Sequence, residues 1–264
     1  VDSPYQIVMK IPSLLLLFIC LASAGFGQDS LQTFLKNQPV IDIHLHLTKG
    51  YETNELYNGL HQNIDEAKRL WVANDLTEHH VVLALGGGNK TFATLYAEQD
   101  ERFWTGLIFP CRGLAEQDQP CEKEFYSEAE LRALYQTGIF KSMGESFFNY
   151  YGIPPTDERL QPYWKIAAEF GIPVGIHADS GPPRERVDAK ENPHYNPAYA
   201  NPELLRPILQ QYPELKIYLM HFGGEYSDQA IALMKDYPQI HCEISAVSLF
   251  GPKVFWEPNL KKLY

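Results

Sequence analysis

The residues best suited to chemistry begin with two histidines, His44 and His46, at the end of a short apolar stretch. Side chains of a β-strand point alternately to opposite faces. A strand over residues 40–47 would therefore place its apolar side chains from Ile41 to Leu47 on one face, and Asp42, His44 and His46 on the other. Two imidazoles on one face can bind a single divalent ion. The alternative is a half-exposed strand that happens to carry histidines.

Three further residues that can bind metal ions follow later apolar stretches. Glu145, His177 and His221 close the predicted strands at residues 139–145, 173–177 and 215–221. A single histidine at a strand end is most simply a core or rim residue with its hydrogen bonds satisfied. Such groups at the ends of four separate strands predict one shared site, provided that the strands are parallel.

The elements that must position these residues alternate between strands and amphipathic helices. Further strands are expected at residues 80–85, 103–109 and 240–244, and helices at 63–74, 91–99, 128–135, 158–170, 202–209, 227–235 and from 258. Ser127 with Glu130 forms a capping box, and Gly171 is placed to end a helix. Helical crossovers return the chain to the same end of a sheet, so these seven units predict parallel strands.

Seven strand-then-helix units nearly complete an eight-stranded (β/α)8 TIM-type barrel, which is the fold we predict. Catalytic groups of such barrels lie at the carboxyl ends of the strands, where the histidines are expected. The alternative fold is an open doubly wound sheet, but its glycine-rich phosphate turn is missing. The run Gly86-Gly87-Gly88 lacks the spacing of that turn, and we interpret it as a tight loop.

The N-terminal region has the pattern of a secretory signal peptide. Lys10 is followed by the apolar run 14–21 and then by small residues up to Gly27. We assign residues 1–27 to the signal, set residues 1–8 aside as a leader before Met9, and expect the protein to be exported, either periplasmic or secreted. The apolar run is too short to span a bilayer, so no stable membrane span is expected.

Composition and cysteine usage limit the partners and the compartment. The formal net charge of −11 argues against nucleic-acid or anionic-membrane partners, which select for clustered Lys and Arg, and does not otherwise indicate a function. A small-molecule substrate is expected from the candidate site and not from the charge. Export leaves Cys111, Cys121 and Cys242. The first two flank a short stretch and could pair in an oxidising compartment. Three cysteines that behave as small apolar residues are the alternative.

The motifs together resemble the amidohydrolase superfamily. The matching segments are Asp42-Ile43-His44-Leu45-His46, Ile176-His177-Ala178 and His221-Phe222-Gly223-Gly224, in that order along the chain. The resemblance implies a TIM barrel holding one or two divalent metal ions, usually zinc. Its implied ligands are His44, His46, His177 and His221, with either Lys141 or Glu145 from the fourth strand. We prefer Glu145, because it stands at the end of its strand.

The sequence leaves open the role of Asp42 and the source of one further acidic residue. Asp42 would be costly to bury alone, so it is expected either to hydrogen-bond a metal-binding imidazole or to pair with a basic side chain. The resemblance also implies an aspartate at the end of an eighth strand, as general base and further ligand. The seven units account for the sequence as far as Tyr264, so we expect residues 28–264 to form a truncated barrel without that strand.

The implied chemistry is hydrolysis of an amide, ester or lactone. A metal held by neutral imidazoles lowers the pKa of a bound water and polarises a carbonyl, while a carboxylate transfers the proton to the leaving group. Some relatives resemble decarboxylases that use the same ligands. A barrel that binds a ligand without turnover is a third possibility, since the eighth-strand aspartate is not found.

Overall fold

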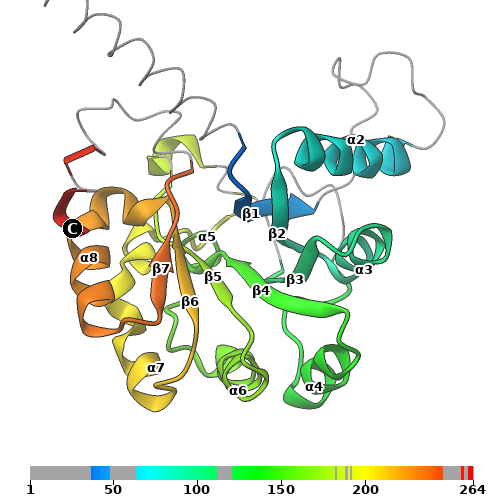
Figure 1. Cartoon of the computed structure of the whole chain (residues 1–264). Helices are drawn as coiled ribbons and strands as arrows, with labels where there is room; N and C mark the ends of the chain where they lie inside the picture. The colour runs from blue at the N-terminus through cyan, green and yellow to red at the C-terminus, as the bar shows by residue number, and fades with distance from the viewer. Residues whose placement is uncertain are drawn as a thin grey trace, which may run out of the picture.

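The computed structural model describes residues 37–47, 64–111, 121–181, 183–187, 190, 192–245, 257–258 and 261–263. Seven strands in this part of the chain form one curled parallel sheet whose spatial order is the order of the sequence (Figure 1). Because no strand order reverses, as it would in a doubly wound sheet, the predicted TIM-type barrel is confirmed. The strands are β1 (Val40–Leu47), β2 (Val81–Gly88), β3 (Phe103–Phe109), β4 (Phe140–Ser146), β5 (Val174–His177), β6 (Ile217–Met220) and β7 (Ile240–Cys242).

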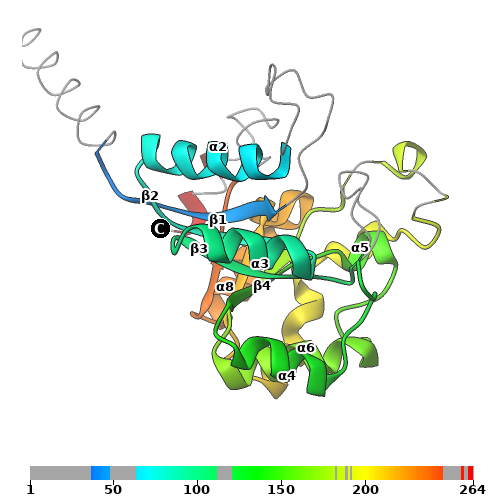
Figure 2. The same cartoon turned by 90° about the vertical axis from the view of Figure 1, so that its right-hand side faces the viewer.

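The longer helices follow one another around the outside of the curled sheet (Figures 1 and 2). They are α2 (Ile64–Glu78), α3 (Lys90–Gln99), α4 (Glu128–Gln136), α6 (Gln161–Phe170), α7 (Arg206–Gln211) and α8 (Ser227–Asp236), and a four-residue helix, α5 (Phe148–Tyr151), follows the end of β4. Short 3-10 segments lie at Glu158–Leu160, Arg184–Arg186, Pro197–Ala200, Pro202–Leu205, His221–Tyr226 and Lys261–Leu263. The described residues hold seven strands, and the eighth strand of a closed barrel is not among them.

Strand β6 shows how the sheet is buried on both faces. Ile217 and Leu219 pack in the main core between the sheet and the helices, whereas Tyr218 and Met220 pack in a smaller cluster inside the curl. All four side chains are at most 5% exposed. A strand covered on both faces has no polar alternation, which explains the continuous apolar runs of the later strands.

The side-chain pattern of β1 differs from the prediction. Ile43 packs in the inner cluster, but Leu45 and Leu47 pack in the main core, so these apolar side chains do not share one face. The pairing with β2 shifts register here: Asp42 pairs with Ala84 and Leu45 with Gly86. Three steps along β1 therefore oppose two along β2, and such a bulge reverses the alternation of every side chain beyond it.

The glycine run 86–88 lies inside β2, so its interpretation as a tight loop was wrong. A Cβ atom at Gly87 would come within 1.9 Å of the carbonyl oxygen of Gly144 in β4. A similar Cβ at Gly86 would lie 2.7 Å from the side chain of Leu47. The glycines are needed because neighbouring chain segments approach β2 closely, and not because the chain turns.

The predicted helix signals are largely confirmed. Ser127 and Glu130 form the full capping box of α4, and Gly171 ends α6 in the left-handed conformation with φ of 67°. Asn201 accepts a hydrogen bond from the backbone of Glu203, as a cap should, but a 3-10 turn precedes α7. The helix predicted over residues 63–74 extends to Glu78, and Asn63 lies outside the described residues.

Cys111 and Cys121 form a disulfide, and Cys242 is the free cysteine of the described part of the chain. Within the same residues, every helix is too short or too polar to cross a bilayer. The predicted signal peptide at residues 1–27 lies outside the described residues, as does most of the helix expected from residue 258.

Candidate metal centre

The five predicted ligands come from four of the seven described strands or from the residue directly after a strand. His44 and His46 are on β1, Glu145 is on β4, His177 is the last residue of β5, and His221 directly follows β6. Because the strands are parallel, their carboxyl ends meet at one edge of the barrel. The structure thus brings all five side chains together, although up to 177 positions separate them in the sequence.

Glu145 stands at the centre of the group, and its side chain is only 2% exposed. One carboxylate oxygen, Oε2, lies 3.2 Å from Nε2 of His44 and 2.7 Å from Nε2 of His46. The other oxygen, Oε1, lies 2.5 Å from Nδ1 of His177 and 3.6 Å from Nε2 of His221. Four imidazoles therefore surround a single buried carboxylate.

The nitrogen atoms of these imidazoles also approach one another. Nε2 of His44 lies 3.3 Å from Nε2 of His46, and Nε2 of His221 lies 3.3 Å from Nδ1 of His177. In a tetrahedral zinc site with bonds of about 2.0–2.1 Å, neighbouring donor atoms are about 3.3–3.4 Å apart. The spacing and chemistry of the donors therefore fit a divalent metal ion.

Three donors from different parts of the sheet lie close enough to one another to share one metal ion. Ligand atoms of His44, Glu145 and His221 all lie within 4.8 Å of one another. Nδ1 of His177 faces Glu145, whereas its Nε2 is buried without a hydrogen-bond partner among the described residues. Imidazole and carboxylate ligands together are typical of zinc, though other divalent ions accept them.

Lys141, the alternative residue from the fourth strand, points away from the group. Its side chain is exposed, and its ammonium lies 5.9 Å from the ring centre of Trp104. Strict alternation would put Lys141 and Glu145 on one face, but the pairing of β4 with β5 shifts register between Met143 and Ser146. That irregularity turns the side chain of Glu145 into the site without turning Lys141.

His221 is held in the left-handed region of backbone conformation, with φ of 58°. Non-glycine residues adopt this region at a cost of about 1–3 kcal/mol, and such residues are found in turns and at functional sites. The next two residues, Phe222 and Gly223, also have positive φ. The turn therefore bends sharply after β6, which keeps the imidazole of His221 at the edge of the barrel.

Two residues of the site were missed in the sequence: Glu243 and Ser245, directly after β7. Oε1 of Glu243 lies 2.9 Å from Nδ1 of His44 and accepts a hydrogen bond of 2.7 Å from the backbone N–H of His221. The hydroxyl of Ser245 lies 2.8 Å from the same Nδ1 atom. A signal was available, because Glu243 stands near the carboxyl end of the strand predicted at residues 240–244, much as Glu145 ends the strand predicted at residues 139–145.

The structure gives Asp42 a different role from the expected one. Its carboxylate accepts a hydrogen bond of 2.9 Å from the backbone N–H of His44. The imidazole of His44 is hydrogen-bonded by Glu243 instead. Asp42 therefore stabilises the bulged backbone of β1, and the predicted contact between its carboxylate and an imidazole belongs to Glu243.

Charges in the metal-free group stabilise one another. Burial alone would raise the pKa of Glu145, but the charge and hydrogen bond of His177, helped by His221 and His44, hold it well below its usual value. Burial opposes a charge on His44, yet hydrogen bonds to Glu145 and Glu243 raise its pKa from 6.5 to about 10. Despite burial, contacts with His44 and two backbone amides lower the pKa of Glu243 to about 2.

These shifts predict how the stability of the metal-free protein depends on pH. The contribution of His44 is complete below pH 6.5 and is lost as the pH rises toward 10, because the folded state holds its proton more tightly. The contribution of Glu243 is complete above pH 4.5 and is lost as the pH falls toward 2. The free energy of unfolding, relative to that of Glu243→Gln, should therefore be greatest between pH 4.5 and 6.5.

Urea unfolding of both proteins in the presence of a chelator, from pH 3 to pH 10, measures this difference. Subtracting the variant removes the pH dependence that the two proteins share, including that of the net charge. A difference that keeps growing from pH 6.5 to pH 9 would contradict the assignment of a raised pKa to His44.

Comparison with known proteins places the chain among proteins of related sequence and fold. A family model described as amidohydrolase matches residues 41–264. Comparison with curated protein sequences finds no match. An uncharacterized TIM-barrel protein from Bordetella bronchiseptica is similar in structure, with a TM-score of 0.52 and 14% identity over 78% of this chain and 75% of that one.

Two further solved structures are similar. A probable 2-pyrone-4,6-dicarboxylic acid hydrolase from Acinetobacter baumannii, with citric acid bound, has a TM-score of 0.52 and 14% identity over 86% of this chain and 76% of that one. A 2,6-dihydroxybenzoate decarboxylase from Rhizobium has a TM-score of 0.46 and 12% identity, covering 85% of each chain. At such identities, the similarities with the higher TM-score establish the TIM-barrel fold alone.

Proposed function

Because this chain belongs to the amidohydrolase family, we propose that it is an exported, metal-dependent hydrolase that cleaves an amide, ester or lactone. The observation that carries the proposal is the convergence of four imidazoles on the buried carboxylate of Glu145 at the carboxyl edge of the barrel. Such an edge is where enzymes of this architecture place their reactive groups.

The residues that would hold the metal are His44, Glu145 and His221, with His46 and His177 beside them. We expect zinc, as one ion or two. When bound, a divalent metal at such a site supplies Lewis acidity and a nucleophilic water at neutral pH. The negative charge of Glu145 lies among the imidazoles and out of solvent, so it offsets part of the positive charge of the metal.

The open side of the site is at His46. Its side chain is 35% exposed, compared with 11% for His44 and 12% for His221. A substrate carbonyl would therefore approach past His46, while His44 and His221 form the closed wall. His177, which is hydrogen-bonded to Oε1 of Glu145, can hold or move a proton at Nδ1.

Aromatic side chains border the site beside His177. The ring centre of Tyr150 lies 5.4 Å from that of His177, and the ring centre of Phe147 lies 6.0 Å away. Flat aromatic surfaces of this kind pack well against unsaturated or cyclic substrates. A small molecule with a planar carbonyl group is accordingly the substrate class that we propose.

The disulfide between Cys111 and Cys121 supports the proposed export. Disulfides form and persist in oxidising compartments and are rare in the cytosol. Cys111 lies just after the end of β3, and therefore at the same edge of the barrel as the histidines. Mass spectrometry of the protein purified from its native host, without reductant, would reveal the disulfide and the mature N-terminus together.

Enzyme assays test the proposed reaction. The purified protein is stripped with a chelator, reloaded with zinc, and supplied with a panel of amides, esters and lactones. Acid released from the esters and lactones is followed with a pH indicator, and amine released from the amides with an amine-reactive dye. The proposal expects turnover that needs the metal. Metal-dependent release of carbon dioxide from a matching panel of aromatic carboxylates, without hydrolysis of the first panel, would replace it with a decarboxylase. Stoichiometric metal without turnover of either panel would favour a binding barrel.

A further inference from the structure

The segment that follows β7 contacts two imidazoles on their far sides from Glu145. Oε1 of Glu243 and the hydroxyl of Ser245 lie 2.9 and 2.8 Å from Nδ1 of His44. The backbone oxygen of Ser245 lies 3.4 Å from Nδ1 of His221. Both rings therefore have hydrogen-bond acceptors at Nδ1, and both direct Nε2 toward Glu145, at 3.2 and 3.6 Å.

A neutral imidazole carries its proton on only one of its two nitrogens. The acceptors at Nδ1 favour the proton there, which leaves the lone pair of Nε2 free to bind a metal. The hydroxyl of Ser245 donates to Oε1 of Glu243 over 2.9 Å, so its own lone pairs can accept from His44. The hydrogen bonds are thus mutually consistent with one tautomer for each ring.

The backbone makes this arrangement rigid. Oε1 of Glu243 also accepts from the backbone N–H of His221, and its other oxygen accepts from the backbone N–H of Ser245. The main chain of Glu243 donates to Leu219 over 3.0 Å and accepts from Phe222 over 2.8 Å. A single carboxylate therefore connects β1 with the sharp turn after β6.

We propose that Glu243 and Ser245 act as a tautomer clamp. This clamp holds His44 and His221 with Nδ1 protonated and Nε2 directed at the metal, and it links the first strand of the sheet to the last two across 199 sequence positions. Glu243 and Ser245 are positioning residues that leave the metal itself to other side chains. The inference rests on the proposed metal-dependent function.

Zinc affinity and the imidazole protons of Glu243→Gln test the clamp. The glutamine keeps the size of the side chain but removes its charge, so zinc affinity should fall about 10- to 100-fold, as for other residues that orient metal-binding histidines. Competition with a chromogenic chelator measures the affinity. NMR of the zinc-loaded protein should show a hydrogen-bonded Nδ1–H proton of His44 that loses its downfield shift in the variant.

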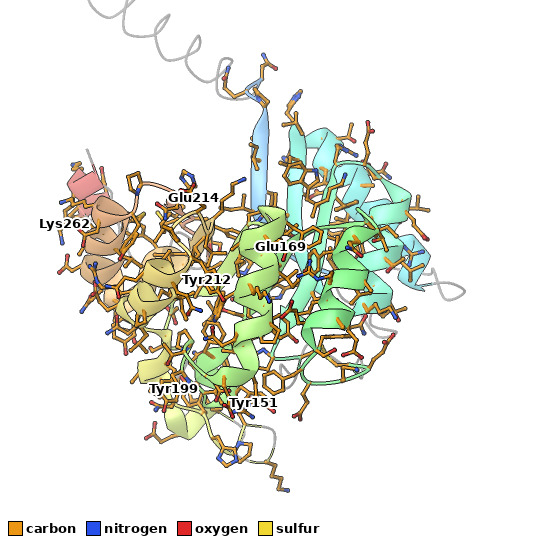
Figure 3. All side chains as sticks on the ribbon, turned by 90° about the horizontal axis from the view of Figure 1, so that it is seen from below. Tyr151, Glu169, Tyr199, Tyr212, Glu214 and Lys262 are labelled. Atoms are coloured by element: carbon orange, nitrogen blue, oxygen red, sulfur yellow. A yellow bond between two sulfur atoms is a disulfide. The ribbon has the colours of Figure 1, made fainter. Side chains whose placement is uncertain are left out.

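The matched control is Glu214→Gln, which makes the same chemical change at an exposed residue between α7 and β6, labelled in Figure 3. Its zinc affinity and the His44 resonance should equal those of the wild type. If Glu243→Gln also retains both, the clamp is overturned while the metal site stands. If the folded wild type binds no zinc, the proposed function fails and the clamp fails with it.

Ser245→Ala provides a second test that does not change the charge of the site. Loss of the hydroxyl removes one acceptor from His44 and one donor from Glu243, so we expect about a fivefold loss of zinc affinity and a smaller displacement of the same NMR signal. This variant decides the question if Glu243→Gln does not fold. Wild-type affinity together with an unmoved signal would then overturn the clamp.

Discussion

The double variant His44→Ala/His46→Ala should lose zinc binding by at least about 1,000-fold. The two imidazoles are donors on one strand, and Nε2 atoms of both face Oε2 of Glu145 within 3.2 Å. Removing them leaves the metal with donors on one side only, and the loss should exceed the 10- to 100-fold expected for residues that merely orient ligands. Isothermal titration with zinc, checked against metal content after dialysis, measures the loss.

A matched control separates ligand loss from the general effect of removing histidines. His79 directly follows α2, His241 lies on β7, and both side chains are exposed. The variant His79→Ala/His241→Ala should bind zinc as the wild type does. Stoichiometric zinc retained by the first variant would contradict the assignment of His44 and His46 as ligands.

Glu145→Gln should reduce both stability and metal affinity. The carboxylate is buried and contacts four imidazoles, so its loss leaves the positive charge that the metal-free site holds on His44 without its main partner. Removing one member of a buried ion pair costs about 3–5 kcal/mol. We expect the metal-free variant to lose about 3 kcal/mol in free energy of unfolding and to bind zinc at least about 100-fold more weakly.

Urea unfolding with a chelator present measures the first effect, and titration with zinc measures the second. Glutamine has nearly the volume of glutamate, so a packing defect is not created at the same time. An unchanged free energy of unfolding would show that Glu145 is not the charged centre of the group. Glu214→Gln, at the surface, should match the wild type in both measurements.

Strands β5 and β6 could be predicted because their residues are buried on both faces. In β6, for example, the run from Ile217 to Met220 has no polar residue, and only a strand covered by helices outside and side chains inside tolerates that. The clustering of the histidines at one edge of the barrel could be predicted because the strands are parallel. Parallel strands bring their carboxyl ends to one edge whatever the spacing in the sequence.

The irregular parts of the strands could not be predicted in the same way. The bulge in β1 moves Ile43 to the inner cluster, and the register shift in β4 separates Glu145 from Lys141. Period-two alternation assumes regular pairing, and one extra residue reverses it. The glycines of β2 were misread for a related reason, because Gly87 is needed where the backbone of β4 approaches it, and Gly86 where the side chain of Leu47 in β1 does, and both neighbours are distant in sequence.

Glu243 was missed because its role depends on a partner that only the folded chain supplies. In the sequence it is an ordinary glutamate near the end of a short predicted strand, 199 positions from His44. Asp42, adjacent to the histidines, was the more obvious candidate, yet its carboxylate is used by the backbone of its own strand. Asp42 was chosen because it is close to the histidines in the sequence. Position near the carboxyl end of a strand would have pointed to Glu243 instead.

Anomalous diffraction from crystals of zinc-loaded protein, recorded on both sides of the zinc absorption edge, tests the metal centre most directly. The predicted result is a peak about 2.0–2.2 Å from Nε2 of His44, Nε2 of His221 and one oxygen of Glu145. A zinc peak elsewhere on the molecule, or no peak beside His44, His221 and Glu145 in the loaded crystal, would contradict it.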